Sequence, residues 1–172
     1  MKAEYWLREI DPGNDAEIAL VAERMRATLM EVLGADRGVA MYTMSWLDNR
    51  VREHLDPART TGAVFLAISP SNEISGHTIV RREHEDDGRL IGLFSTTYVH
   101  PSHRRGAVAS MLLQEGEAWM EARELPFAVT YTDDQNEPLI ALYRKHGYRI
   151  VDAQSDMVKI EKPLGLRTSA VG

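Results

Sequence analysis

The spacing of apolar residues changes several times along the chain, and each change predicts a new secondary-structure element. Loose alternation over Glu4–Ile10 predicts a first strand, which ends at the turn-forming sequence DPGND. Apolar residues then recur at helical spacing over residues 18–32, after an Asn14 that is followed by Glu17 in the manner of a capping box. A second amphipathic helix is expected over Met41–Leu55. The N-terminal third is therefore predicted to hold a strand and two helices.

From Thr60 the apolar spacing becomes that of strands. The near-continuous apolar run TGAVFLAIS is typical of a buried strand. The segments EISGHTIVRRE and RLIGLFSTTYV follow, and the turn sequences PSN and EDDG separate the three runs. Three strands joined by such short turns form an antiparallel meander.

The C-terminal half alternates helices with strands. A helix is expected over residues 108–122, a strand over Leu125–Tyr131, a short helix in NEPLIALYRKHG and two final strands in YRIVD and DMVKIEK. A strand, a helix and a strand in succession imply one parallel strand pair. We therefore expect one α/β domain over residues 1–163, with three α/β/α layers and a central mixed, mostly antiparallel sheet. Residues 164–172 are weakly patterned and are expected to form a flexible tail.

The composition disfavours nucleic acid or membrane as the main partner. The 172 residues carry a formal net charge of -6, whereas nucleic acids and anionic membranes reward a basic surface. The absence of cysteine excludes disulfides, thiolate metal sites and a cysteine nucleophile. The N-terminus lacks the apolar core of a signal peptide, and no apolar run approaches the length of a membrane span. These features predict a soluble, cytoplasmic protein.

One short segment combines charge with small residues where a strand is predicted to become a helix. After Val99 the chain reads HPSHRRGAVA, which ends in the run Arg104–Ala109. The first turn of a helix has unpaired N–H groups and a partial positive charge, and small residues let a ligand approach that backbone closely. This combination suits a phosphate or a pyrophosphate. The alternative is a solvated loop with a glycine turn, in which small residues only permit close helix packing.

The same segment resembles the pyrophosphate loop of the GNAT superfamily of acyl-CoA-dependent N-acetyltransferases. That loop reads Arg/Gln-x-x-Gly-x-Gly/Ala and follows a strand that ends in Val-x-Pro. Here the strand would end at Val99–Pro101 and the loop would fall on Arg104–Ala109. The chain departs from the family at Ala107, where glycine is usual, and the added methyl group can narrow the space for a pyrophosphate.

A second resemblance lies further along the chain. The family motif Asn-x-x-Ala-x-x-x-Tyr, closed by a glycine and an aromatic residue, is similar to Asn136, Leu139, Tyr143, Gly147 and Tyr148, with leucine in place of alanine. The segment ISGHTIV also resembles the family's glycine-bearing third strand. Two motifs in the family's order are more specific than either motif alone, and the resemblance covers roughly residues 60–151.

The resemblance implies a binding site for acetyl-CoA. The main chain of Tyr98 and Val99 would bind the pantetheine arm, and Asn136 would either bind that arm or only cap its helix. The pyrophosphate would contact the Arg104 side chain and the N–H groups that follow it, which belong to Arg105, Gly106, Ala107, Val108 and Ala109. Arg105 is alternatively an exposed residue without a ligand.

The resemblance also implies that Tyr143 protonates the leaving thiolate. A phenol titrates at about 10, close to a thiol, so the proton transfer is nearly balanced. The alternative is a tyrosine that only packs its helix against the sheet. The strand LIGLFSTTYV holds no acid or histidine to serve as a general base. Ser95 and Thr97 are therefore expected to hold a water that relays the amine proton.

Other titratable residues are alternative general bases, although each also suits a surface or turn position: His77, Glu83, Asp133 and Asp134. Two further histidines, His100 and His103, lack a carboxylate or thiol partner at metal-ligand spacing. No metal site is therefore expected.

The leading hypothesis is an N-acetyltransferase that moves an acetyl group from acetyl-CoA to a primary amine of a small molecule or a peptide. The alternative is a catalytically inactive acyl-CoA-binding domain with a sensor or regulatory role, which Ala107 and the missing strand carboxylate favour. The acceptor is expected to be selected by the two N-terminal helices, with Tyr42 and Trp46, and by the last strands. The alternative is that Tyr42 and Trp46 only pack against the core. No nucleic acid or membrane is expected to bind, and the chain would act as a monomer or a homodimer.

Overall fold

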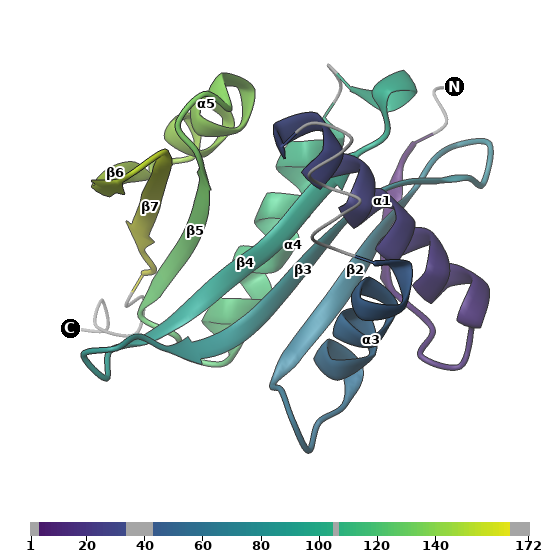
Figure 1. The fold of residues 1–172 in the computed structure, drawn as a ribbon, viewed down its shortest axis with the longest axis horizontal. Helices are drawn as coiled ribbons and strands as arrows, with labels where there is room; N and C mark the ends of the chain where they lie inside the picture. The colour runs from purple at the N-terminus through teal and green to yellow at the C-terminus, as the bar shows by residue number, and fades with distance from the viewer. Residues whose placement is uncertain (1–3, 34–42, 105–106, 166–172) are drawn as a thin grey trace.

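A seven-stranded mixed sheet forms the centre of the protein (Figure 1). The computed structural model describes residues 4–33, 43–104 and 107–165. The strand order is β1-β2-β3-β4-β5-β7-β6, and neighbouring strands are antiparallel except for the parallel pair β4 and β5. The strands are β1 (Trp6–Glu9), β2 (Gly62–Ile68), β3 (Ile74–His84), β4 (Leu90–Val99), β5 (Phe127–Asp133), β6 (Arg149–Gln154) and β7 (Met157–Pro163).

Helices cover both faces of this sheet. α1 (Asp15–Leu33) and α3 (Met44–Leu55) pack together on one face, and α4 (Val108–Ala122) crosses the other (Figure 1). A short 3-10 helix at Pro101–His103 joins β4 to α4, and α5 (Glu137–Lys145) follows β5. The predicted order of elements, the parallel pair and the three layers are therefore confirmed.

The apolar run of β2 is continuous because both of its faces are covered. Alternate side chains of a strand point to opposite faces of the sheet. One set packs with α1 and α3, and it consists of Val64, Leu66 and Ile68. The other set packs with α4, and it consists of Ala63, Phe65 and Ala67. The sheet thus separates two apolar cores.

Among the described α-helices, side-chain caps begin α1, α3 and α5 but not α4. Asn14 Oδ1 accepts the amides of Ala16 and Glu17, so Asn14 caps α1 as predicted. The capping box is not completed, because the Glu17 carboxylate accepts from Arg8 and from the Asp11 amide. Thr43 caps α3, which begins at Met44 rather than at the predicted Met41; residue 41 lies outside the described part of the chain. Asn136 caps α5. Ala107, at the cap position of α4, has no side chain that accepts a hydrogen bond.

The end of the domain extends slightly into the predicted tail. Leu164 is buried, and its amide donates to the Pro126 carbonyl at 2.8 Å, so this residue belongs to the packed domain. Residues 166–172 of the predicted tail lie outside the described part of the chain. Among the described helices, none has the length and apolar character needed to cross a membrane.

Candidate active site

The parallel strands β4 and β5 separate halfway along their length (Figure 1). They pair only where Gly92–Phe94 lies beside Ala128–Thr130. In the β3–β4 ladder, Phe94 lies opposite Val80 and Thr96 lies opposite Ile79. Ser95 is therefore an extra residue on β4 that forms a bulge. A bulge bends its strand and increases the local twist. Beyond Ser95, β4 therefore turns away from β5, and its backbone groups on that side face a gap.

A cavity of about 850 Å³ occupies this gap. Ser95, Thr96, Thr97, Tyr98, Val99 and Thr130 line its middle. We call one side the α4/α5 half, which includes Arg104, Ala109, Asn136, Leu139, Leu142 and Tyr143. We call the other side the α1/α3 half, which includes Met25, Thr28, Trp46, Arg50, Tyr131 and Met157. The structure thus brings most of the predicted site residues to one cavity.

The N-terminus of α4 opens the α4/α5 half. Its first backbone bond runs from the Met111 amide to the Ala107 carbonyl, so the N–H groups at the start of the helix remain without helical partners. Ala109 lines the cavity, whereas the Val108 side chain is buried in the core and leaves only its backbone for a ligand. Unpaired N–H groups and the helix dipole favour an anion at this position.

The loop before α4 is held by a predicted site residue. Arg104 Nε donates to the Val99 carbonyl at 2.7 Å, and the guanidinium lies 5.8 Å from the centre of the Tyr98 ring. Ala107 has a φ of -86°, which alanine adopts without strain, so its backbone conformation does not require the family's usual glycine. Arg105 and Gly106 lie outside the described part of the chain.

Tyr143 lies between the apolar core and the cavity. Its ring makes edge contacts with Phe94 at 5.7 Å and with Tyr148 at 4.8 Å, and only 1% of the residue is exposed. Burial raises the pKa of the Tyr143 phenol, and hydrogen bonding with Thr97 and Thr130 partly offsets that rise. The phenol therefore stays protonated throughout the physiological pH range. Leu139, four residues before Tyr143 on α5, lines the cavity as well, so the two residues share one face of the helix.

Asn136 uses its side chain to hold the end of β5 and the start of α5 together. Its Oδ1 accepts the Leu139 amide at 3.4 Å, and its Nδ2 donates to Thr132 Oγ1 at 3.1 Å. Both contacts are within the protein, which supports the cap function that the sequence left open. Because Asn136 also lines the cavity, it still presents polar atoms to that space.

The middle of the cavity is built on β4. The Ser95 side chain is exposed at the bulge, whereas Thr97 Oγ1 lies 2.8 Å from Thr78 Oγ1 of the neighbouring strand. Tyr98 is buried and stacks on His77 with 5.9 Å between the ring centres. Opposite Val99, β3 carries Gly76, where a Cβ atom would lie 2.5 Å from the Tyr98 carbonyl oxygen. The predicted glycine of β3 thus permits close approach of the two strands beneath the cavity.

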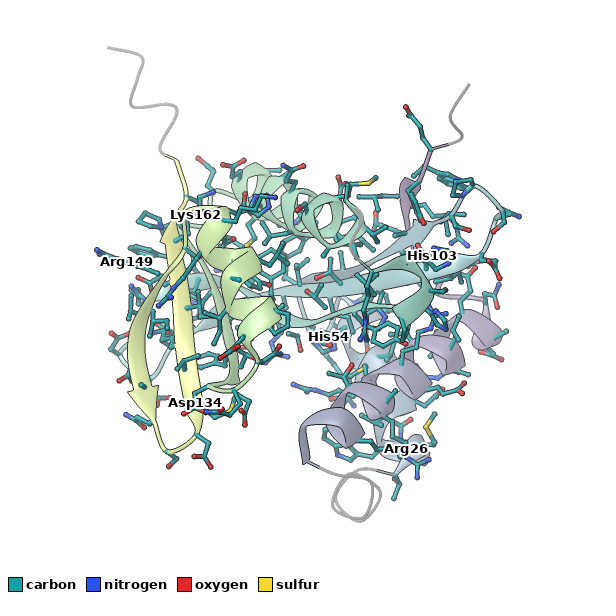
Figure 2. All side chains as sticks on the ribbon, turned by 90° about the horizontal axis from the view of Figure 1, so that it is seen from above. Arg26, His54, His103, Asp134, Arg149 and Lys162 are labelled. Atoms are coloured by element: carbon teal, nitrogen blue, oxygen red, sulfur yellow. The ribbon has the colours of Figure 1, made fainter. Side chains whose placement is uncertain are left out.

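The alternative general bases lie in different places. Asp133 lines the cavity. His77 is fully buried outside the lining, and burial together with the positive charge of Arg24 lowers its pKa to about 3. Glu83 pairs with Arg81 at 2.5 Å on the wall of a second cavity. Asp134 is exposed near the turn between β6 and β7 (Figure 2).

The two loop histidines bond to neighbouring hydroxyl groups. His103 Nδ1 lies 2.7 Å from the Tyr5 hydroxyl, and His100 Nδ1 lies 2.8 Å from Ser102 Oγ. Within the described ranges, no group of three or more histidine, aspartate or glutamate residues is arranged to hold a metal ion.

Several cavity residues were not predicted. Thr130 lies beside the Tyr143 phenol and donates to the Phe94 carbonyl at 3.1 Å. Arg50, Tyr131 and Met157 line the α1/α3 half. The sequence assigned this side to the two N-terminal helices and the last strands, which include Arg50 and Met157, but it did not single out these two residues and gave no part to Tyr131. Trp46 does line that half, and Tyr42 lies outside the described residues. No local motif marks the three missed residues, because each comes from a different element.

Comparison with family models assigns this chain to a protein family. Residues 30–148, more than half of the chain, match the acetyltransferase (GNAT) family. The chain therefore belongs to the GNAT family of acetyltransferases, as its two motifs predicted. A search of the curated proteins found no match.

Solved structures share the fold over nearly the whole chain. A GNAT-family acetyltransferase from Streptococcus pneumoniae is 21% identical, with a TM-score of 0.71 over 94% of this chain and 100% of its own. The PaiA N-acetyltransferase of Thermoplasma acidophilum, in complex with coenzyme A, is 15% identical, with a TM-score of 0.73 over 93% and 99%. A GNAT-family acetyltransferase from Staphylococcus aureus is 14% identical, with a TM-score of 0.69 over 94% and 100%. At these identities the likeness establishes the fold.

Proposed function

We propose that the protein transfers an acetyl group from acetyl-CoA to a primary amine of a small molecule or a peptide. The observation that carries this proposal is the cavity between β4 and β5, which joins the uncapped N-terminus of α4 to the α1/α3 half and has Tyr143 on its wall. Coenzyme A bound to the T. acidophilum PaiA protein, which has the same fold, supports the same ligand here. The acyl donor would occupy the α4/α5 half, and the amine would enter from the α1/α3 half.

The α4/α5 half has the chemical groups that coenzyme A requires. We assign the pyrophosphate to the Arg104 side chain and to the N–H groups from Arg105 to Ala109. The backbone of Tyr98 and Val99, which has no strand partner on the β5 side, would bond the pantetheine amides. Leu139 and Leu142 supply apolar surface for the pantetheine chain, and Asn136 shapes the wall by capping α5.

Tyr143 is our candidate for the proton donor. Acetyl-CoA supplies a thioester, from which the C–S bond breaks while a C–N bond to the amine forms. The leaving sulfur needs a proton, and the buried phenol holds one because its pKa is raised. Burial raises the pKa of a thiol in the same way. The leaving thiol and the Tyr143 phenol therefore stay closer in acid strength than the raised pKa of the phenol alone suggests.

The proton lost by the amine leaves by a different route. We propose that Ser95, at the exposed bulge, and Thr97 hold a water molecule that accepts this proton. Asp133 is the alternative acceptor, because its carboxylate belongs to a residue that lines the cavity. A pH profile of kcat/KM distinguishes them, because a direct carboxylate base adds its own ionisation to the profile.

The decisive experiment combines binding and turnover. Coenzyme A is expected to raise the melting temperature, because a ligand that binds only the native state stabilises it. Acetyl-CoA with a panel of primary amines is expected to release free thiol and acetylated product. Binding without thiol release for every amine would favour an acyl-CoA-binding domain instead, and absence of any melting shift would refute the cofactor assignment.

A further inference from the structure

Arg50 places an unneutralised positive charge in the α1/α3 half of the cavity. It lies on α3 and lines the cavity. Its backbone carbonyl bonds His54 Nδ1, but among the described side chains none forms an ion pair or a hydrogen bond with its guanidinium. Arg52, two residues away, pairs with Asp48 at 2.8 Å and with Asp15 at 3.0 Å. The charge of Arg50 is therefore available to a ligand.

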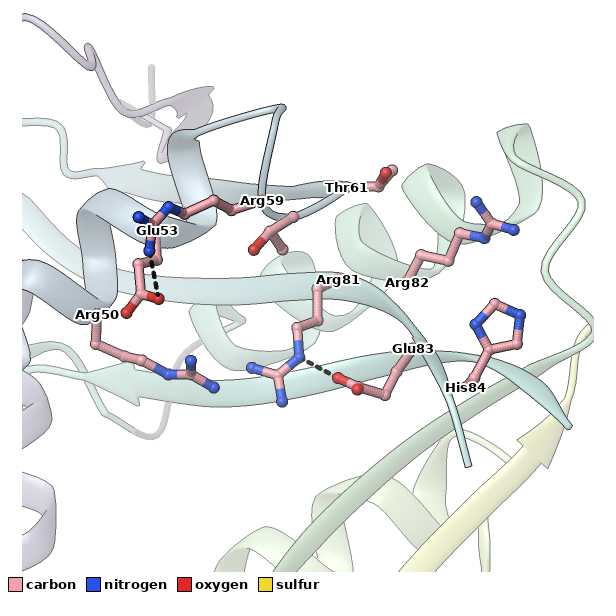
Figure 3. A pocket seen from close by; sticks show the side chains of 9 residues that line it. Arg50, Glu53, Arg59, Thr61, Arg81, Arg82, Glu83 and His84 are labelled. Carbon is pink, nitrogen blue, oxygen red and sulfur yellow. Dashed lines mark hydrogen bonds and ion pairs between the residues drawn. The ribbon is translucent and has the colours of Figure 1, made fainter. Parts of the chain in front are cut away.

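The surroundings of Arg50 make an anion more favourable still. Arg50 also lines a second cavity of about 410 Å³, where its guanidinium and that of Arg81 are turned toward each other (Figure 3). The nearby carboxylates already pair with other arginines: Glu83 with Arg81 at 2.5 Å and Glu53 with Arg59 at 3.6 Å. Two neighbouring guanidinium groups repel each other, and a bound anion would relieve that repulsion.

Two other cations lie near Tyr131 of the α1/α3 half, and both already pair with carboxylates. Lys159 pairs with Glu85 at 2.5 Å, and Arg89 pairs with Glu85 at 2.7 Å and also with Glu161. These four side chains form a closed network next to Tyr131, whose hydroxyl lies 3.5 Å from Glu85. An acidic ligand group in this half would therefore bind at Arg50.

Apolar and aromatic side chains surround the same half. Trp46 is 50% exposed, Tyr131 is 48% exposed and Met157 is 45% exposed, although each is a large hydrophobic residue. All three line the cavity together with Met25. Exposed apolar groups gathered in one concave site favour a ligand with an apolar body.

We infer that the acceptor amine is an amino acid with an apolar or aromatic side chain, whose carboxylate binds Arg50. Its side chain would lie among Trp46, Tyr131 and Met157, and its amine would point toward the bulge at Ser95. The inference rests on the proposed acetyltransferase function and specifies its substrate class. Because a guanidinium binds a carboxylate through two parallel hydrogen bonds, Arg50 would fix the orientation of the acceptor as well as its charge.

Matched substrates and variants test this assignment. Wild type, Arg50→Gln and Arg59→Gln would each be assayed with phenylalanine and with phenylalaninamide, which differ in the carboxylate. We expect Arg50→Gln to lower the ratio of kcat/KM for phenylalanine to kcat/KM for phenylalaninamide by about 10- to 100-fold, the range for a lost charge-assisted hydrogen bond. The different basicities of the two amines cancel, because the ratio is compared between proteins. Arg59→Gln, which removes an arginine from the second cavity alone, is expected to leave the ratio unchanged.

A binding measurement separates this inference from the proposed function. The Kd of N-acetylphenylalanine for the CoA-loaded protein is expected to rise about 10- to 100-fold in Arg50→Gln, whereas that of N-acetylphenylalaninamide stays unchanged. Such binding without thiol release would refute the proposed function and retain the carboxylate site. The inference would be overturned, and the function left intact, if thiol is released but Arg50→Gln does not change the ratio of kcat/KM for the amino acid to kcat/KM for its amide. This result would have to hold for phenylalanine, methionine and leucine alike.

Discussion

The two halves of the cavity are built from different parts of the chain. The α4/α5 half uses two short segments, the β4–α4 connection with Arg104 and Ala109, and the helix α5 with Leu139 and Tyr143, and it includes the start of α4, where the backbone N–H groups lack helical partners. The α1/α3 half uses single side chains from separate elements, such as Trp46 on α3, Tyr131 on β5 and Met157 on β7. Backbone groups bind a ligand that stays the same, whereas side chains can change with the acceptor. The comparison therefore predicts that mutations in the two halves affect different kinetic constants.

The largest effect is expected at Tyr143, which lies at the reacting end of the α4/α5 half. Tyr143→Phe keeps the ring contacts with Phe94 and Tyr148 but removes the proton. We expect turnover to fall about 10- to 10⁴-fold, from partial rescue by water at the lower end to full loss of general acid catalysis at the upper end, with near-normal stability and CoA affinity. Steady-state rates beside thermal melts would measure both effects.

Tyr148→Phe is the matched control for Tyr143→Phe. It removes a hydroxyl that donates to Glu117 at 2.6 Å, away from the cavity lining. Stability should decrease by about 1.5–3 kcal/mol, the range for a hydrogen bond to a charged group, while turnover is retained. Equal turnover in wild type and Tyr143→Phe would assign Tyr143 to packing alone.

Arg104 tests whether the α4/α5 half binds the pyrophosphate. Arg104→Ala is expected to weaken acetyl-CoA binding about 10- to 100-fold, and more than Arg105→Ala does, because Arg104 occupies the motif position and lines the cavity. Calorimetric titration of both variants would give the two affinities. Equal losses would show that the register of the loop motif is wrong. Acceptor KM, which belongs to the α1/α3 half, should change little.

The same contrast explains which parts of the site were predictable. Residues of the α4/α5 half, such as Arg104 and Tyr143, lie in local motifs whose spacing is visible in the sequence. Arg50 and Met157 became neighbours of the cavity only through the packing of α3 and the pairing of β5 with β7. Nothing in their local sequence encodes that distant packing.

The order of strands and helices was predictable from local sequence, whereas the bulge in β4 at Ser95 was not. Hydrophobic periodicity reports which faces of each element are buried, and this was sufficient for the order of strands and helices. The bulge at Ser95 depends on the register between β3 and β4, which is a property of two strands together. The sequence identified Ser95 as a candidate for proton relay. That β4 separates from β5 at this residue became visible only in the structure.

His77 lies beneath the junction of the two halves and is expected to affect stability. Both of its ring nitrogens lack a hydrogen-bond partner among the described residues, and its pKa is lowered to about 3. As pH falls below about 6.5, the unfolded chain binds a proton that the native protein does not accept until about pH 3. Stability should therefore decrease with acidity in this window, by at most about 1.4 kcal/mol per pH unit.

His77→Leu should remove this part of the acid sensitivity, while His54, whose pKa burial also lowers, retains its own contribution. Urea denaturation of both proteins at several pH values between 7 and 5 would show the difference. Parallel stability curves for wild type and His77→Leu would contradict the assignment. CoA affinity at neutral pH serves as the control, because His77 lies outside the cavity lining.

The smallest effect is expected at Ala107, where the chain departs from its family. Its φ of -86° is ordinary for alanine, so Ala107→Gly relieves no backbone strain. Glycine is a better N-cap residue than alanine, but it also gives the unfolded chain more freedom, and the two effects oppose each other within about 1 kcal/mol. Removal of the methyl group can only widen the approach to the N–H groups of α4. We therefore expect CoA affinity to stay unchanged or to improve, as measured by calorimetric titration. A clear loss of affinity would mean that the Ala107 methyl group itself contacts the ligand or orders the loop, and that the α4/α5 half depends on side chains as the α1/α3 half does.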